Sequence, residues 1–181
     1  TGKDPVKMAK LPDTEGMKNR ILIQKGHNVT YAQVFRYAGA KLIDVGLSDK
    51  VGFNDLEASI DSETAAVAYV QSHLCNYKGS LGLEEVVRIA HERGVAVIVD
   101  AADQIPPASN LNRFTSMGAD LVAFSGGKAL GGPGNTGLLL GRRDLVEAAG
   151  MQSSPNFGIG RPMKVSKEQI VGLLVALELY L

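Results

Sequence analysis

Short apolar runs alternate with amphipathic segments along most of this chain. Six runs are rich in Ile, Leu, Val and Ala, and their length and composition predict β-strands. These runs are 20–24, 41–46, 65–70, 95–100, 120–124 and 136–141. Runs 65–70 and 95–100 are apolar almost throughout, which is typical of strands buried on both faces of a parallel sheet.

Segments between the strands show apolar residues at helical spacing. They cover residues 31–38, 54–60, 83–94, 142–149 and 166–181. About eleven glycine-rich residues link run 120–124 to run 136–141 with no helix. That link is too short for a usual parallel crossover, so one strand of this pair is expected to be antiparallel. The pattern predicts an α/β fold of three layers, α/β/α, around a mostly parallel sheet.

Local signals refine three of the helices. In 31–38, Tyr31, Val34, Phe35 and Ala38 fall on one face, which predicts a buried face. Asn54 is a candidate N-cap of the next helix. The helix 83–94 is expected to pair Glu84 with Arg88 and to end at Gly94.

Charge and cysteine content exclude several classes of protein. The chain has 19 acidic and 19 basic residues, so nothing indicates a surface for nucleic acid or anionic membranes. Its one cysteine, Cys75, excludes an internal disulfide framework and a zinc site built from several cysteines; we expect no metal. No apolar run approaches the roughly 18 residues that span a bilayer, and the first residues of the sequence lack the apolar core of a secretory signal. The sequence therefore indicates a soluble, cytoplasmic protein.

The last helix has a clear start. Ser166 and Gln169 have the spacing of a capping box, and Val165 and Ile170 fit a hydrophobic staple. The helix then reaches Leu181 with no stop signal. We therefore expect the sequence to be part of a larger chain.

The segment SGGKALGGPGNTG places Lys128 among glycines after an apolar strand. A phosphate-binding P-loop would need Ser or Thr after the lysine and a glycine six residues before it, where the chain has Ala129 and Val122. Residues 132–137 match the dinucleotide pattern G-x-G-x-x-G, but a strand-like LLLG follows instead of a helix. Two interpretations remain: a lysine presented for covalent chemistry, whose glycines leave room for a flat ligand and for a tight return into the sheet, or a surface lysine.

Asp100 favours the covalent interpretation. It ends the buried strand VIVD, where a carboxylate is costly without a charged or hydrogen-bonded partner. The protonated pyridine nitrogen of pyridoxal phosphate is such a partner, because the carboxylate keeps the ring cationic and electron-withdrawing.

Three segments, RILIQKGHNVTY, VIVDAADQIPP and GADLVAFSGGKALGGPGNTGLLLG, resemble the large domain of fold-type I pyridoxal phosphate enzymes. Within that superfamily the chain is most similar to the group of selenocysteine synthase and D-glucosaminate-6-phosphate ammonia-lyase. The resemblance implies a lyase or transferase that acts on an amino acid or amino sugar acid by α-proton abstraction and β-elimination. The alternatives are cysteine desulfurase, aldolase or aminotransferase chemistry, or an inactive scaffold.

The resemblance also implies roles for individual residues. Lys128 would form the Schiff base and move the α proton, Asp100 would bind the pyridine nitrogen, and Ser125 would bind the cofactor phosphate. His27 would stack on the ring, although it could be an ordinary loop histidine, and Ser125 could be a plain turn serine.

Further residues have weaker assignments. Gln104 or Asp103 would contact the ring hydroxyl, although relatives place Gln or His where this chain has Asp103. Ser72 and His73 would face the substrate or simply cap a strand end, and Arg161 would bind an anionic substrate group or form a structural salt bridge.

The resemblance implies an organisation and an assembly as well. Residues 1–165 would be the cofactor-binding large domain without its N-terminal part, and 166–181 would lead into a C-terminal small domain. The protein would act as a homodimer or larger homo-oligomer on a small molecule. The neutral charge disfavours tRNA as a partner without excluding it.

Overall fold

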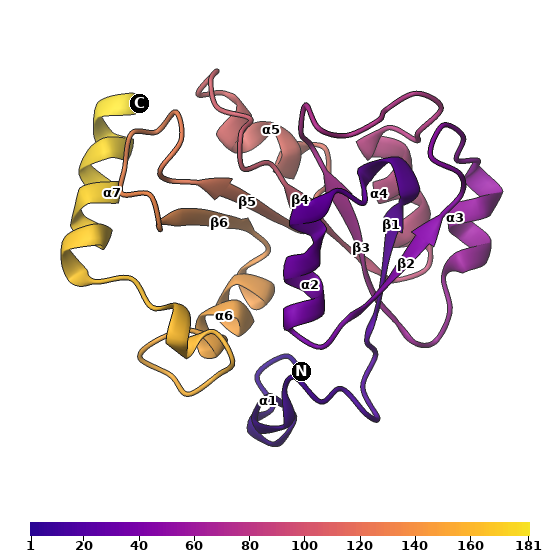
Figure 1. Ribbon diagram of the computed structural model, residues 1–181, viewed down its shortest axis with the longest axis horizontal. Helices are drawn as coiled ribbons and strands as arrows, with labels where there is room; N and C mark the ends of the chain where they lie inside the picture. The colour runs from indigo at the N-terminus through magenta and orange to yellow at the C-terminus, as the bar shows by residue number, and fades with distance from the viewer.

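The computed structural model describes all residues, 1–181, and contains one six-stranded sheet (Figure 1). The strands are β1 (Arg20–Gln24), β2 (Lys41–Val45), β3 (Thr64–Val70), β4 (Ala96–Asp100), β5 (Leu121–Ser125) and β6 (Gly137–Gly141). Their order in the sheet is β2-β1-β3-β4-β5-β6. The first five are parallel, and β6 runs antiparallel to β5. Both the α/β fold class and the antiparallel strand are confirmed.

Seven α-helices and three short 3-10 helices surround the sheet. They are α1 (Pro5–Lys10), α2 (Gln33–Tyr37), α3 (Phe53–Ser59), α4 (Leu83–Glu92), α5 (Asn110–Ser116), α6 (Arg143–Gln152) and α7 (Lys167–Tyr180), with η1 (Lys25–His27), η2 (Thr30–Ala32) and η3 (Arg161–Met163). None of these helices has the length and apolar character that crossing a membrane requires.

The two faces of the sheet bury unequal amounts of apolar surface. On one face, α3, α4 and α5 pack against the strands in a cluster of 24 buried residues, with Val67, Val97 and Val122 at its centre. On the other face, where α2 lies (Figure 1), the cluster has only five buried residues, among them Ile23 and Ala68. Alternate residues of β1 point to opposite clusters, as the period of two in a strand requires.

The predicted buried face of helix 31–38 is wrong. The segment splits into η2 and α2, and Tyr31 and Val34 are 64% and 57% exposed. Ala32 is buried instead, and Phe35 packs against the smaller core. The 3-10 turn before α2 changes the angular spacing, so one helical period does not describe both parts.

The start of α3 also differs from the prediction. Asn54 lies inside the helix and is not its N-cap. Gly52 is the N-cap, and its N–H donates to the carboxylate of Asp55 at 2.7 Å. A side chain in the first turn thus accepts from the backbone N–H of the N-cap residue, whereas Asn54 was expected to accept from a backbone N–H of the first turn.

Helix α4 follows its pattern except in one ion pair. Arg88 pairs with Glu92 at 3.3 Å and not with Glu84. Both partners are available four residues away, and Arg88 also lies over the ring of Phe53, 4.9 Å from its centroid. Gly94 follows the helix with φ +67°, as the predicted stop requires.

A buried carboxylate, that of Asp120, forms several hydrogen bonds at the edge of the sheet where β4 and β5 begin. Asp120 precedes β5 and is 4% exposed. Its Oδ2 accepts from Nε2 of His91 at 2.8 Å and from N–H of Val97 at 2.7 Å, while Oδ1 accepts from Arg142 at 3.0 Å. Burial alone would raise the pKa of Asp120, but these hydrogen bonds outweigh it and lower the pKa.

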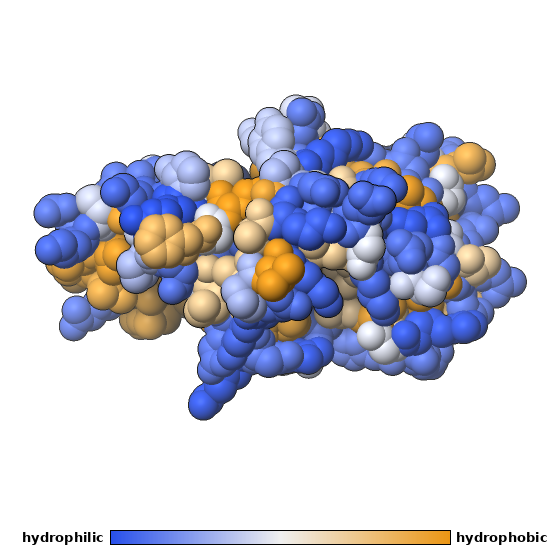
Figure 2. All heavy atoms as spheres, turned by 90° about the horizontal axis from the view of Figure 1, so that it is seen from below, coloured by the Kyte–Doolittle hydropathy of each residue, from blue (hydrophilic) through white to orange (hydrophobic).

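Helix α7 lies beside β6 and the glycine-rich loop (Figure 1). Its capping box is confirmed: Ser166 Oγ accepts from Gln169 N–H, and Gln169 accepts from Ser166 N–H at 2.7 Å. Leu173 enters the larger core, whereas Leu174 and Leu179 are exposed. Figure 2 shows apolar side chains gathered at this end of the molecule.

Candidate active site

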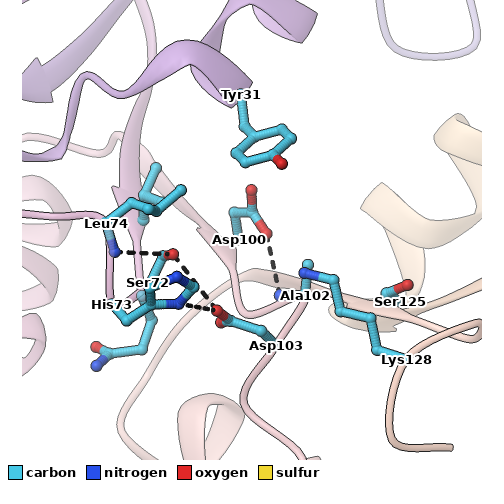
Figure 3. A pocket seen from close by; sticks show the side chains of 11 residues that line it. Tyr31, Ser72, His73, Leu74, Asp100, Ala102, Asp103, Ser125 and Lys128 are labelled. Carbon is cyan, nitrogen blue, oxygen red and sulfur yellow. Dashed lines mark hydrogen bonds and ion pairs between the residues drawn. The ribbon is translucent and has the colours of Figure 1, made fainter.

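The carboxyl ends of β3, β4 and β5 meet at one edge of the sheet, where parallel α/β folds bind their ligands. A pocket of about 440 Å³ lies at this edge. Its lining residues come from these strand ends, the loops after them, and η2 (Figure 3). They are Tyr31, Val70, Gln71, Ser72, His73, Leu74, Asp100, Ala102, Asp103, Ser125 and Lys128.

Asp100 is the last residue of β4 and stands in the middle of the pocket wall (Figure 3). Its Oδ1 accepts from the N–H of Ala102 at 3.0 Å, and its Oδ2 has no hydrogen bond within the chain. The backbone bond fixes the carboxylate while one oxygen stays open to a ligand. This half-buried acid is what a cationic ring nitrogen needs as a partner.

Lys128 follows β5 on the turn 126–130 and is exposed in the pocket. Its ammonium makes no hydrogen bond or ion pair within the chain. Figure 3 shows the side chain reaching from the glycine-rich turn toward Ala102 and Asp100. Ser125, the last residue of β5, lines the same side of the pocket. The structure thus brings the predicted lysine, acid and serine together.

The glycines before Lys128 serve the tight return of the chain. A Cβ at Gly126 would clash with the side chain of Thr136, and one at Gly127 would clash with the backbone of Gly134. Clearance for a flat ligand, the other expected reason for these glycines, is not needed to explain them.

Asp103 is the centre of a polar network on the opposite pocket wall. Its Oδ2 lies 3.0 Å from Nδ1 of His73 and accepts from Ser72 Oγ at 3.4 Å, while Oδ1 accepts from Gln104 at 2.8 Å. Burial tends to raise the pKa of Asp103, but the hydrogen bonds from Gln104 and His73 and the charge of Lys128 lower it overall. The residues predicted for the ring hydroxyl therefore bind each other and His73.

His27 does not line the pocket. It is fully buried, and its ring meets Tyr69 and Tyr77 edge-on with centroids 4.6 and 4.9 Å away. Burial lowers the pKa of His27 to about 4, so the imidazole is neutral near pH 7. Since these tyrosines enclose the imidazole, His27 does not lie where the predicted stacking on a cofactor would place it.

Arg161 also lies away from the pocket. Its guanidinium donates to the backbone carbonyls of Pro155 and Asn156 and lies over the ring of Phe157, 4.7 Å from the centroid. These contacts organise the turn around η3. Arg161 forms no salt bridge, which was the alternative, and its contact with an anionic substrate group stays a prediction.

Tyr31 lines the pocket although the sequence did not predict it as a site residue. Its ring stands at the pocket mouth above Asp100 (Figure 3). The helical pattern assigned it to a buried face, yet it is 64% exposed. Its place after the carboxyl end of β1 was a partial signal, because that end of the sheet faces the ligand edge, but His27 lies in the same segment and shares that signal.

Comparison with known proteins shows the family and the fold of the chain. The family model described as "SelA: L-seryl-tRNA selenium transferase" matches residues 15–181. D-glucosaminate-6-phosphate ammonia lyase of Salmonella typhimurium is 37% identical over 99% of this chain and 48% of its own. A 5'-C-glycyluridine monooxygenase-decarboxylase of a Streptomyces species is 40% identical over 99% of this chain and 44% of its own. A solved structure of D-glucosaminate-6-phosphate ammonia-lyase superposes with a TM-score of 0.89 at 37% identity, over 99% of this chain and 48% of that one.

The fold and these matches define the class: the chain has the fold of the fold-type I pyridoxal phosphate enzymes. More narrowly, the chain belongs to the L-seryl-tRNA selenium transferase family. This confirms the resemblance and the class of cofactor that the sequence predicted. The chain spans less than half the length of the relatives described above.

Proposed function

We propose that Lys128 carries pyridoxal phosphate and that the enzyme removes a β substituent, or ammonia, from an amino acid or amino sugar acid. The observation that supports this most directly is the shared pocket of Lys128 and Asp100, with an ammonium free of ion pairs facing a carboxylate with one open oxygen. A lysine that is only part of the surface would not be expected to share a pocket with such a carboxylate. The presence of both Lys128 and Asp100 in the pocket also argues against an inactive scaffold.

The pocket residues suit the cofactor. Asp100 offers its free Oδ2 to a protonated ring nitrogen, and Ser125 offers a hydroxyl to a phosphate oxygen. We propose Tyr31, rather than His27, as the aromatic side chain against the ring, because it stands at the pocket mouth above Asp100. When bound, the cofactor withdraws electrons from the substrate α carbon.

Three residues of the pocket then have separate roles in the proposed reaction. Asp100 keeps a proton on the ring nitrogen, since its carboxylate favours the cationic form. Lys128 removes the proton from the α carbon as a neutral amine, and no carboxylate of the chain forms an ion pair with it. Tyr31 limits how far a flat ring can tilt.

The same proposal extends to organisation and assembly. Residues 1–165 form a cofactor-binding domain, and α7 leads to a second domain, which its exposed Leu174 and Leu179 support. The protein works in the cytoplasm as a homo-oligomer, with a subunit contact near the pocket. Exposed Leu74 beside the pocket and exposed Val34 on α2 support that contact.

The names of the relatives cover ammonia removal, selenium transfer to seryl-tRNA, and an oxygen-dependent decarboxylation. We favour elimination or transfer because Lys128 is free to take the α proton. The protein's neutral charge favours a small substrate over tRNA.

The test is to reconstitute the protein with pyridoxal phosphate and to reduce the complex of protein and cofactor with borohydride. Mass spectrometry should place the label on Lys128, and Lys128→Ala should lack both the label and the visible absorption band. A screen of amino acids and amino sugar acids should then show α-proton exchange and release of ammonia. A label elsewhere, or release of carbon dioxide in place of exchange, would overturn the assignment.

A further inference from the structure

A histidine and an aspartate form an oriented pair in the pocket wall across from Lys128. Nδ1 of His73 lies 3.0 Å from Oδ2 of Asp103. The pair comes from two different strand ends, since His73 follows β3 and Asp103 follows β4. Both residues line the same pocket as Lys128 (Figure 3).

The position of Asp103 is fixed independently of His73. Gln104 donates to Oδ1 at 2.8 Å, and Ser72 Oγ donates to Oδ2 at 3.4 Å. Its lowered pKa keeps the carboxylate charged near neutral pH. A charged, held carboxylate accepts from Nδ1–H and so sets the tautomer of the imidazole.

The second ring nitrogen of His73, Nε2, makes no hydrogen bond within the chain. With Nδ1 bound to Asp103, Nε2 is the atom that can give or take a proton at a ligand. The side chain is 79% exposed, so solvent can restore its proton after each turnover. By contrast, His91 forms a similar pair with Asp120 at 2.8 Å, but at the opposite end of the sheet and away from the pocket.

We propose that His73 is the catalytic acid that protonates the leaving group on the substrate β carbon, with Asp103 as its positioning residue. This rests on the elimination chemistry proposed above. Lys128 takes the α proton, and the electron pair left at the α carbon forms the α–β double bond. The bond from the β carbon to oxygen breaks and its electron pair stays on the oxygen. The oxygen takes the Nε2 proton of the His73 imidazolium and leaves as water, and the imidazole that remains is neutral with its Nδ1–H on Asp103.

The alternative is that Lys128 itself returns its newly gained proton to the leaving group. The two cases differ in whether loss of His73 removes the acid, and this matters only for a leaving group that needs a proton. A hydroxyl leaves as water only if an acid protonates it, whereas chloride leaves without a proton. An acid acting on the leaving group is therefore needed for serine and not for 3-chloroalanine.

The experiment compares these two substrates in the holoenzyme, its His73→Gln and Asp103→Asn variants, and His91→Gln as the matched control. Elimination is followed as pyruvate, and exchange of the α proton with deuterated solvent is followed by NMR. For His73→Gln we expect elimination from serine to fall about 10²- to 10⁴-fold, with α-proton exchange and elimination from 3-chloroalanine unchanged. Asp103→Asn should lose about 10- to 100-fold with serine and nothing with 3-chloroalanine.

Other outcomes overturn the inference. Equal losses with both substrates would make His73 a binding or structural residue, and an unchanged rate with serine would assign the proton to Lys128. A wild-type enzyme that exchanges the α proton of serine without eliminating water would also contradict an acid at the leaving group. Failure of wild type to bind the cofactor or to exchange any α proton would instead refute the proposed function itself.

Discussion

The imidazole of His27 meets the ring of Tyr69 edge-on, with the two centroids 4.6 Å apart, and neither imidazole nitrogen has a hydrogen-bond partner. Tyr77 encloses the imidazole from another side, and its hydroxyl accepts from Ser72 N–H at 2.7 Å and donates to Val70 O at 3.1 Å. His27 therefore supports the loop that carries Ser72 and His73, while staying outside the pocket.

Burial of His27 should make stability depend on pH. Its pKa in the folded state is about 4, against 6.5 when unfolded, so the unfolded state binds the proton first as pH falls. The free energy of unfolding should decrease from about pH 6.5 to pH 4, by up to about 3 kcal/mol. His27→Phe should lose this dependence in denaturant titrations, and exposed His73→Gln should keep it. An unchanged slope in His27→Phe would show that other groups cause it.

Asp120 should act in the same direction over a lower pH range. Its pKa is lowered by hydrogen bonds from His91, Val97 and Arg142. The stability that it supplies is present above the unfolded pKa of about 4 and is lost as pH falls through the lowered folded value. Asp120→Asn should cost about 2 kcal/mol at pH 7 and less at pH 3. Denaturant midpoints at both pH values measure this, and an equal cost at both would contradict it.

The sequence predicted the sheet and the place of the site because both follow from the alternation of apolar strands and helices along the whole chain. Apolar strands separated by helices leave few arrangements, and the short glycine-rich link to β6 required an antiparallel strand. Asp100, Ser125 and Lys128 were predicted to meet because parallel strands bring their carboxyl ends to one edge.

The positions of Tyr31, which lines the pocket, and of His27, which is buried, could not be predicted in the same way. They are four residues apart, on two successive 3-10 turns, and which of them turns inward depends on Tyr69 and Tyr77, far away in the sequence. The link between His73 and Asp103 likewise joins two loops, and no local spacing encodes it.

Tyr31 should contribute to cofactor binding through its ring. Loss of an aromatic contact costs about 0.5 to 1.5 kcal/mol, so Tyr31→Ala should raise the cofactor Kd by up to about tenfold. Tyr31→Phe keeps the ring and should bind as wild type does. Fluorescence titration with pyridoxal phosphate measures both values. If His27→Phe weakened binding while Tyr31→Ala did not, the two roles would have to be reversed.

Asp100 should control the reaction more than the fold. Asp100→Asn keeps the hydrogen bond to Ala102 N–H but removes the charge that holds a proton on the ring nitrogen. We expect α-proton exchange to fall about 10²- to 10³-fold, with the thermal midpoint nearly unchanged. Asp44→Asn is the matched control, because Asp44 pairs with Lys25 at 3.7 Å and lies outside the pocket. Equal effects of the two substitutions on exchange would remove Asp100 from its role.

The glycine-rich turn offers a steric test with a built-in control. A methyl group at Gly126 would overlap the side chain of Thr136, whereas a Cβ at Gly134 meets nothing within 4 Å. Gly126→Ala should therefore displace Lys128, two residues away, and overpacking of this kind costs about 1 to 3 kcal/mol. Thermal unfolding and borohydride labelling should both decrease in Gly126→Ala and stay at wild-type values in Gly134→Ala. If Gly126→Ala lost labelling while its thermal midpoint stayed unchanged, the glycine would be providing room for the cofactor rather than for Thr136.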